Sequence, residues 1–241
     1  MQHFLDNYPI LYYPEVDSTN IVLKQKLKEQ NLTAPFAIAA GFQSAGRGQR
    51  QNIWQSTANK NVLCSFLVQG LSLNQLPFIT NVAVLAIGKT LEAFGISNYQ
   101  VKWPNDIFVD EKKIAGILIE NVIAGTDLKH CVVGIGLNVN QTEGLLDRAT
   151  SMASINSNQY PINDVLIYLF QSFYNLLKQE ESALLVYINS KLYKKNKIVT
   201  FLSEKGITPY TVHTILKNGN LLVSESAQFL ELQHHMVKWQ L

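Results

Sequence analysis

The chain has 241 residues, of which 47% are hydrophobic and 16% are charged, and its formal net charge is +2. A chain of this length can bury a sizeable core, as one large domain or as a large and a small one. The near-neutral charge gives no indication of nucleic-acid or membrane-surface binding, and we expect neither. We expect no apolar run long enough to span a bilayer and no signal peptide. Cys64 and Cys131 each lie in an apolar run, which predicts reduced, buried thiols in a cytoplasmic protein.

The first predicted elements are a strand at 9–16 and a helix that begins near residue 21. The sequence DSTN at 17–20 separates them, and Leu23 and Leu27 carry the helical spacing. The simpler interpretation is that this polar quartet caps the helix. The alternative is that its hydroxyls and amide, at the positive end of the helix, hold a polar group of a ligand.

A second polar segment follows the buried strand predicted at 35–40. It is a loop at 41–54 in which two glycines flank Arg47, with Arg50 three residues further on. Glycine lets the backbone approach a ligand closely, and each guanidinium can bind a pair of phosphate or carboxylate oxygens. The alternative is an ordinary solvated loop. The segment lacks the lysine of a phosphate-binding P-loop and the third glycine of the dinucleotide fingerprint.

The central feature of the sequence is a predicted hairpin, which follows a strand at 61–68 and a buried helix at 76–94. Its turn has the sequence KWPND at 102–106, and an apolar run follows at 113–120. A half-buried lysine costs free energy unless an anion meets it. The polar groups on this hairpin therefore predict a site for phosphates and carboxylates. They are Lys102, Asn105, Asp106 and Lys113.

The strand predicted at 130–140 contains two glycines, which weaken a strand unless something approaches it closely. One interpretation is that Gly134 and Gly136 leave room for a flat group, with Asn138 beside it. The other is that they mark a bulge or tight sheet packing.

The last third of the chain changes character. Helices predicted at 161–180 and 182–192 are followed by short strands joined by turns. This change predicts a domain boundary near 190–196. We therefore expect an α+β protein with a large ligand-binding domain at 1–192 and a small β domain at 193–241.

Other catalytic and metal-binding patterns are missing from the sequence. No GxSxG elbow supports a serine hydrolase. The five histidines lack the spacing to the cysteines that metal sites show. We therefore expect no metal site held by the protein alone, and any Mg²⁺ would arrive with a nucleotide.

The motifs together resemble those of the biotin–protein ligases, or biotin–[acetyl-CoA-carboxylase] ligases. Five segments occur in the family's order, at 17–20, 43–48, 102–106, 113–120 and 134–138. The resemblance covers most of the large domain, and the C-terminal segment fits the family's small β-barrel domain. It implies a mixed β-sheet catalytic domain with helices packed largely on one face. Because the first motif begins within the first twenty residues, we expect no DNA-binding N-terminal extension and no repressor role.

The resemblance implies a two-step reaction. The carboxylate of biotin attacks the α-phosphate of ATP, which gives biotinyl-5′-adenylate and pyrophosphate. A lysine of a biotin carboxyl carrier protein then attacks the mixed anhydride. Biotin and ATP are therefore the expected substrates, with Mg²⁺ on the nucleotide, and the enzyme is expected to be a cytoplasmic monomer or homodimer.

The resemblance also implies roles for single residues. The expected catalytic residues are Lys113, Arg47 and Asp106; the two cations would stabilise charge that develops between carboxylate and phosphate. Asp106 is the candidate for orienting or deprotonating the incoming lysine. Biotin is expected to contact Ser18, Thr19, Asn20, Gln43, Gly46, Arg47, Lys113 and Gly116. ATP and the adenylate are expected to contact Arg47, Gly48, Gln49, Arg50, Trp54, Lys102, Asn105, Lys113 and Asn138.

The loop departs from the family pattern at two positions. Many members have Arg where this chain has Gln49, and Gly where it has Gln51. The loss of a cation predicts looser closure over the adenylate, and we expect Arg50 or Lys102 to compensate in part.

Two alternative functions remain open from the sequence. A lipoate–protein ligase has a related fold and adenylating chemistry, and a non-catalytic ligand-binding module would keep the fold without the reaction. The WPND turn and the GRG loop favour biotin. The presence of both loop arginines and both hairpin lysines favours a working site over an inactive one.

Overall fold

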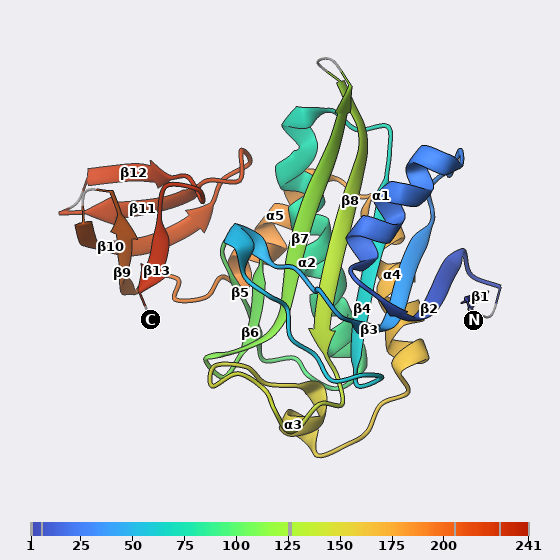
Figure 1. Cartoon of the computed structure of the whole chain (residues 1–241). Helices are drawn as coiled ribbons and strands as arrows, with labels where there is room; N and C mark the ends of the chain where they lie inside the picture. The colour runs from blue at the N-terminus through green and yellow to red at the C-terminus, as the bar shows by residue number, and fades with distance from the viewer. Residues whose placement is uncertain (1, 6, 125–126, 205, 227, 241) are drawn as a thin grey trace.

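The computed structural model describes the chain except for residues 1, 6, 125–126, 205, 227 and 241. An eight-stranded sheet forms its centre, in the order β1-β2-β3-β4-β8-β7-β6-β5 (Figure 1). Strands β2 and β3 run parallel and the other neighbours run antiparallel, so the sheet is mixed, as predicted. The strands are β1 (His3–Phe4), β2 (Ile10–Val16), β3 (Ala37–Gln43), β4 (Asn61–Val68), β5 (Tyr99–Lys102), β6 (Asp106–Val109), β7 (Lys112–Ala124) and β8 (Asp127–Asn138).

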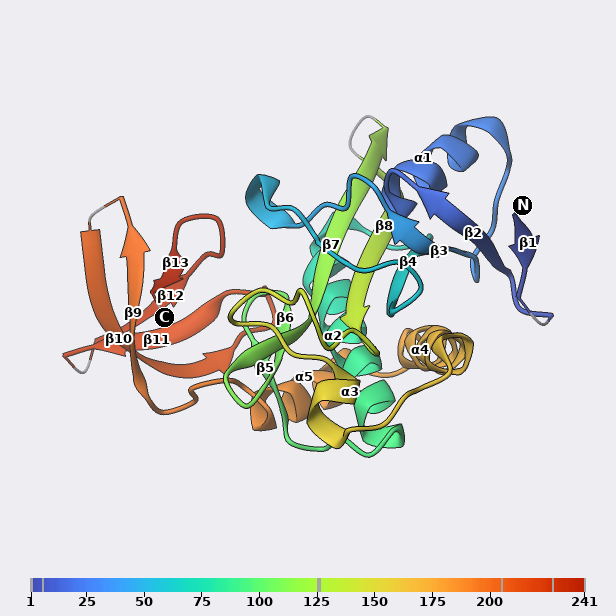
Figure 2. The same ribbon diagram turned by 60° about the horizontal axis from the view of Figure 1, so that its bottom comes forward.

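The two faces of this sheet carry separate cores. Successive strand residues point to opposite faces, so Ile38 and Leu67 pack with Leu23 of α1 (Thr19–Glu29), whereas Ala37 and Phe66 join the larger core. Helices α2 and α4 cover that larger core, with α5 beside α2 (Figure 2). The expectation that the helices lie largely on one face is confirmed. Besides α1 and α2, the helical segments are η1 (Gln49–Gln51), η2 (Leu73–Gln75), α3 (Met152–Asn156), α4 (Ile162–Leu176) and α5 (Glu181–Ser190).

Helix α2 (Leu76–Ala93) corrects one expectation. With η2 it forms a helical stretch, Leu73–Ala93, that is long and apolar enough by composition to cross a membrane. The expectation that no apolar run is long enough was therefore wrong. Most of this stretch is buried inside the protein, against the sheet and α4, as in a core helix. The positive φ of Gly95, +85°, ends the helix where the sequence predicted it.

The C-terminal region forms a second, five-stranded antiparallel sheet, in the order β12-β11-β10-β9-β13. Two tryptophans join it to the central sheet: Trp239 Nε1 donates to the carbonyl of Trp103, and Trp103 Nε1 donates to the carbonyl of Gly219, both at 2.8 Å. The domain division at 192/193 stays a prediction, but α5 ends at Ser190 just before it. The strands are β9 (Ile198–Ser203), β10 (Gly206–Ile215), β11 (Leu221–Glu225), β12 (Gln228–Leu232) and β13 (Lys238–Gln240).

Candidate active site

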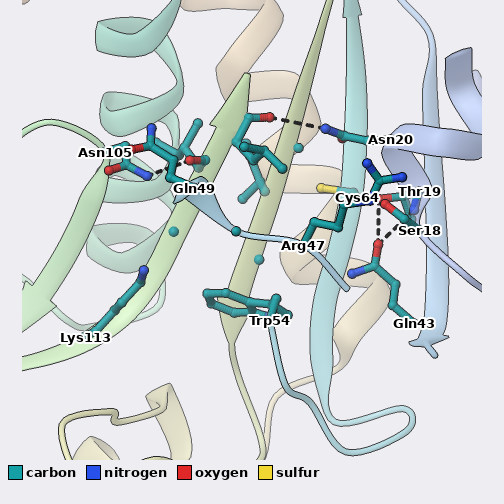
Figure 3. Close-up of a pocket in the computed structure, with 17 residues that line it drawn as sticks. Ser18, Thr19, Asn20, Gln43, Arg47, Gln49, Trp54, Cys64, Asn105 and Lys113 are labelled. Carbon is teal, nitrogen blue, oxygen red and sulfur yellow. Dashed lines mark hydrogen bonds between the residues drawn. The ribbon is translucent and has the colours of Figure 1, made fainter. Parts of the chain in front are cut away.

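The candidate site is a pocket on the α1 face of the central sheet. The segment that joins β3 to β4 crosses over β7 and β8 here, and small residues of those strands form the floor (Figures 2 and 3). Most of the residues predicted for biotin or the nucleotide line this pocket. The lining is Ser18, Thr19, Asn20, Gln43, Arg47, Gly48, Gln49, Trp54, Cys64, Asn105, Lys113, Gly116, Ile117, Leu118, Gly134, Ile135 and Gly136.

One end of the pocket is a buried cluster of hydrogen bonds at the start of α1. Gln43 Oε1 accepts from the backbone N–H of Thr19 at 2.8 Å and lies 3.1 Å from the Thr19 hydroxyl oxygen. The buried Ser65 hydroxyl lies 2.7 Å from Thr19 Oγ1 and 2.5 Å from Asn20 Oδ1. Ser18 occupies the N-cap position, but its side chain makes no capping hydrogen bond. The expectation of side-chain capping was therefore wrong for Ser18, which lines the pocket instead.

A carboxylate behind the pocket holds the side chain of Asn20. Asn20 Nδ2 donates to Glu120 Oε2 at 2.7 Å and to the carbonyl of Leu118 at 3.3 Å. Lys24 Nζ lies 2.5 Å from Glu120 Oε1. Burial raises the pKa of Glu120, but the hydrogen bonds from Lys24 and Asn20 and the charges of Lys24 and Arg47 outweigh it and hold this pKa below its ordinary value. Glu120 is therefore an ionised acceptor near neutral pH.

Two glycines on the floor make room for side chains of the protein itself. A Cβ at Gly134 would lie 2.5 Å from Asn20 Oδ1, and a Cβ at Gly136 would lie 2.4 Å from the indole of Trp54. No such approach is possible for a residue with a side chain. In this structure the two glycines accommodate Asn20 and Trp54 of the protein itself, and the interpretation that they leave room for a flat group of a ligand stays a prediction.

The loop over the floor is a small hairpin. Arg47 and Ile53 form an antiparallel bridge, and the N–H of Trp54 donates to the carbonyl of Gly46 at 3.0 Å. A Cβ at Gly46 would lie 2.5 Å from the carbonyl oxygen of Trp54, so glycine lets the two arms meet. The indole N–H of Trp54 is buried and has no hydrogen-bond partner among the described residues. This hairpin brings Arg47 and Trp54 to the pocket (Figure 3).

Arg50 turns away from the pocket and contacts the C-terminal region. Its φ of +55° lies in the left-handed region. Its Nη2 donates to the carbonyls of His234 and Val237, the second at 2.7 Å. Arg50 does not line the pocket. It ties the loop to the small sheet, a contact that the sequence did not predict.

The opposite end of the pocket carries the ammonium of Lys113 (Figure 3). Lys113 Nζ lies 2.6 Å from Asp106 Oδ1 and 5.6 Å from the centre of a Trp54 ring. A Cβ at Gly116 would lie 2.9 Å from this Nζ, so the neighbouring floor position has to be small. Asp106 does not line the pocket but holds Lys113 from the side.

Lys102 lies between aromatic rings rather than in the pocket. Its Nζ is 5.2 Å from the ring centre of Phe108, 5.4 Å from that of Trp239 and 4.0 Å from Asp106 Oδ2. Burial lowers the pKa of Lys102, while the charge of Asp106 acts in the opposite direction. The side chain is only 13% exposed, so its charge is held at the junction of the two sheets.

The two asparagines predicted for the nucleotide differ in position. Asn105 lines the pocket; its Nδ2 donates to the carbonyl of Ile117 at 2.7 Å and its carbonyl accepts from the N–H of Ile117 at 3.1 Å. Asn138 is buried outside the lining and donates to the carbonyl of Thr150 at 3.0 Å. Asn138 therefore holds the chain after β8 in this structure.

Sequence reasoning missed four residues of the site. Lys24 lies among surface residues of α1 and does not stand out by its local pattern, whereas Ser65 lies within the apolar run of β4. Glu120 belongs to a recognised motif but had no role. Cys64 lines the pocket, and burial raises the pKa of its thiol well above the ordinary value. The usable signal was Ser65 itself, a polar residue in a strand of otherwise buried apolar neighbours.

The pocket is nearly filled by its own side chains. Its free volume is about 50 Å³, whereas a small-molecule site usually offers roughly 300 Å³ or more. A second cavity of about 370 Å³ lies between the sheet, the start of α2 and the C-terminal region. Gln49, Asn105 and Ile117 line both. The larger cavity therefore adjoins the site.

The fold and the site together define an α+β protein whose pocket has a buried hydrogen-bonding end and a cationic end. The chain belongs to the biotin/lipoate A/B protein ligase family, whose sequence model matches residues 12–138, more than half of the chain. The family resemblance of the sequence motifs is thereby confirmed.

Three relatives illustrate the similarity. The bifunctional ligase/repressor BirA of Bacillus spizizenii is 28% identical over 169 residues, which are 68% of this chain and 52% of that protein. BirA of Escherichia coli K12 is 28% identical over 210 residues, 86% of this chain and 58% of that protein. The chain thus spans about half the length of the curated relatives it matches. A biotin protein ligase from Aquifex aeolicus, solved with biotin and ATP, has a TM-score of 0.80 at 27% identity, over 96% of this chain and 98% of that chain.

Proposed function

We propose that this protein is an ATP-dependent biotin–protein ligase, which forms biotinyl-5′-AMP and transfers biotin to a lysine of a biotin carboxyl carrier protein. The observation that carries the proposal is the two-ended pocket, in which a neutral hydrogen-bonding cluster faces the ammonium of Lys113. Biotin has the matching shape, with a polar ring at one end and a carboxylate at the other. The family match supports the same chemistry.

The polar end suits the ureido ring of biotin. Thr19 and Asn20 are each only 3% exposed and are held by Gln43 and Ser65. Such a cluster binds a ring that both donates and accepts hydrogen bonds, and it rejects a ring that cannot. Ser18 and Gln43 complete this end.

The cationic end supplies charge where the reaction develops it. Lys113 and Arg47 flank Trp54, and the bond between carboxylate and α-phosphate forms between these cations. Fixed positive groups stabilise such a transition state more than the ground state. Gly48, Gln49 and the indole N–H of Trp54, which has no partner among the residues that the structure describes, lie on the nucleotide side in this proposal.

Asp106 serves the second step in this proposal. The acceptor lysine has to be neutral when it attacks the adenylate, so it needs a proton acceptor or an orienting carboxylate. Asp106 lies 2.6 Å from Lys113 and therefore adjoins the carboxylate-activating end. As Lys113 turns to the phosphate, Asp106 becomes free to receive the incoming ammonium.

The remaining substrates and surroundings are part of the same proposal. Mg²⁺ accompanies the nucleotide and is held by its phosphates. Among the described residues, no group of three or more His, Cys, Asp or Glu side chains could hold a metal ion. We propose a cytoplasmic enzyme that acts without nucleic acid or membrane, as a monomer or homodimer.

The test is transfer of biotin to a purified carrier domain with ATP and Mg²⁺. Lys113→Ala should reduce pyrophosphate release and labelling by about 10²–10³-fold. Lys112→Ala is the matched control, because Lys112 is the exposed neighbour on β7 and lies outside the pocket. Its activity should equal that of the wild type. Labelling with lipoate and not biotin would replace the proposal by the alternative ligase, and no adenylation of either acid would indicate a binding module.

A further inference from the structure

Glu120 controls the direction of the hydrogen bonds at the polar end of the pocket, although it does not line the pocket. It accepts from Asn20 Nδ2 at 2.7 Å and pairs with Lys24 at 2.5 Å. An ionised carboxylate has no proton to donate. The atom of Asn20 that faces Glu120 must therefore be the amide nitrogen.

This constraint determines which atom of Asn20 faces the ligand. With Nδ2 turned to Glu120, Oδ1 points to Gly134, where a Cβ would lie only 2.5 Å away. Ser65 Oγ lies 2.5 Å from the same oxygen. Because Oδ1 has no proton, the proton between these two atoms has to come from Ser65. One lone pair of Oδ1 is then used, and among the described residues no second donor meets this oxygen, which leaves the other lone pair for a ligand.

The same direction continues along the cluster. Since Ser65 gives its single proton to Asn20, its short contact with Thr19 Oγ1 at 2.7 Å has to receive a proton from Thr19. The N–H of Thr19 still donates to Gln43 Oε1 at 2.8 Å. The charge of Glu120 thus sets the donors and acceptors from Lys24 to the hydroxyl of Thr19.

We propose that Glu120, held by Lys24, is a positioning residue that fixes the Asn20 amide so that the polar end accepts a ring N–H. The proposal rests on the proposed function, because it names the ring of biotin as the group that is selected. A neutral residue at 120 would lose this control, since Gln can donate as well as accept. The carbonyl of Leu118, at 3.3 Å, is then the remaining acceptor that holds the Asn20 nitrogen.

The experiment compares direct binding of biotin with binding of its cyclic carbamate analogues, in which a ring oxygen replaces one or the other ureido N–H. Calorimetry on the full chain would give both affinities. The analogue that lacks the N–H accepted by Asn20 Oδ1 should bind the wild type about 10²-fold more weakly than biotin does. Glu120→Gln should reduce this preference to about five-fold or less, mainly through weaker biotin binding. A role in stability alone would lower the thermal midpoint and leave the preference unchanged.

Two further variants complete the test. Glu29→Gln is the matched control. Glu29 lies on α1, the helix of Asn20 and Lys24, pairs with Lys26 at 4.0 Å and is exposed, so the preference should not change. Lys24→Met removes the cation that holds Glu120 and should give an intermediate preference; it decides the question if Glu120→Gln does not fold. An unchanged preference in folded Glu120→Gln overturns this inference and leaves the proposed function standing. If Glu120→Gln is unfolded, an unchanged preference in Lys24→Met has the same meaning. A wild type that binds no biotin overturns the proposed function and this inference with it.

Discussion

The two ends of the pocket are built in different ways. At the polar end, Thr19, Asn20, Gln43 and Ser65 come from a helix start and two strands, and they are bonded to one another. At the other end, the covering groups come from the Trp54 hairpin, whose Arg47 is exposed and whose position depends on a contact with the C-terminal region.

This difference separates recognition from closure. A cluster fixed by regular secondary structure pays its ordering entropy during folding, so it can select a ligand ring with little rearrangement. We expect a hairpin that fills its own pocket to move when a ligand enters and then to cover the reacting groups. We therefore expect changes at the polar end to alter biotin affinity, and changes at the hairpin end to alter formation and retention of the adenylate.

The sharpest test is Gly134→Ala. The new Cβ would lie 2.5 Å from Asn20 Oδ1, and Asn20 cannot retreat because Glu120 and Ser65 hold it. Overpacking of this kind costs about 1–3 kcal/mol, so the Kd for biotin should rise by roughly 10–10²-fold. Calorimetric titration with biotin in the absence of ATP measures the effect. Wild-type affinity in this variant would show that the polar end is not rigid.

Gly136→Ala is the matched partner, two residues further along the same face of β8. Its Cβ would lie 2.4 Å from the Trp54 indole, so the hairpin and not the polar cluster has to move. Pyrophosphate release should fall by about 10–30-fold, while biotin affinity stays within about three-fold of the wild type. Equal loss of biotin affinity in the two alanine variants would contradict the division of the pocket.

Arg50→Ala tests the link between the hairpin and the small sheet. Two backbone carbonyls, of His234 and Val237, would lose their donor. We expect biotin affinity to be unchanged and release of biotinyl-5′-AMP to become about five- to ten-fold faster, because the covering loop is less ordered. Release can be followed by trapping the free adenylate. Faster release would mean that Arg50 compensates for the cation missing at Gln49 by holding the loop in position. Unchanged adenylate formation and retention would exclude any compensation by Arg50.

The smallest expected effect is a pH dependence at the same contact. Burial, followed by the neighbouring charges of His235 and Arg50, lowers the pKa of His234 below its ordinary value of 6.5. The stability that neutral His234 contributes is therefore complete above 6.5 and is lost as the pH falls through that value toward the lowered one. Adenylate release should be about two- to three-fold faster near pH 5.5 than near pH 7.5. In His234→Gln this part of the pH dependence should disappear. Neither the substitution nor the change of pH should alter biotin affinity.

The sequence predicted the parts of the site that depend on local pattern. Glycines within a strand predicted a close approach at Gly134 and Gly136, and the family resemblance of the motifs assigned Gly116, Thr19 and Asn20 to the pocket that they line. The mixed sheet followed from the family resemblance rather than from periodicity.

The directions of the long charged side chains could not be predicted in this way. Arg50 contacts carbonyls more than 180 residues away, and Glu120 meets Asn20 and Lys24 across about 100 residues. Such contacts depend on the final packing of separate elements, and no local spacing encodes them. Lys102 was assigned to the nucleotide because cations attract phosphates, yet burial between Phe108 and Trp239 gives it a different surrounding.

The three tryptophans of the chain lie at two different places: one lies in the pocket, and two lie at the junction of the two sheets. Trp103 and Trp239 donate their indole N–H groups across the junction of the sheets, whereas Trp54 lies in the pocket and its N–H has no partner in the described part of the chain. If the indoles carried a fluorine label, the NMR spectrum would contain three resonances with separate meanings. One would report occupancy of the pocket, and the other two would report docking of the small sheet. A single sample could therefore resolve ligand entry from domain movement without any added probe at the surface.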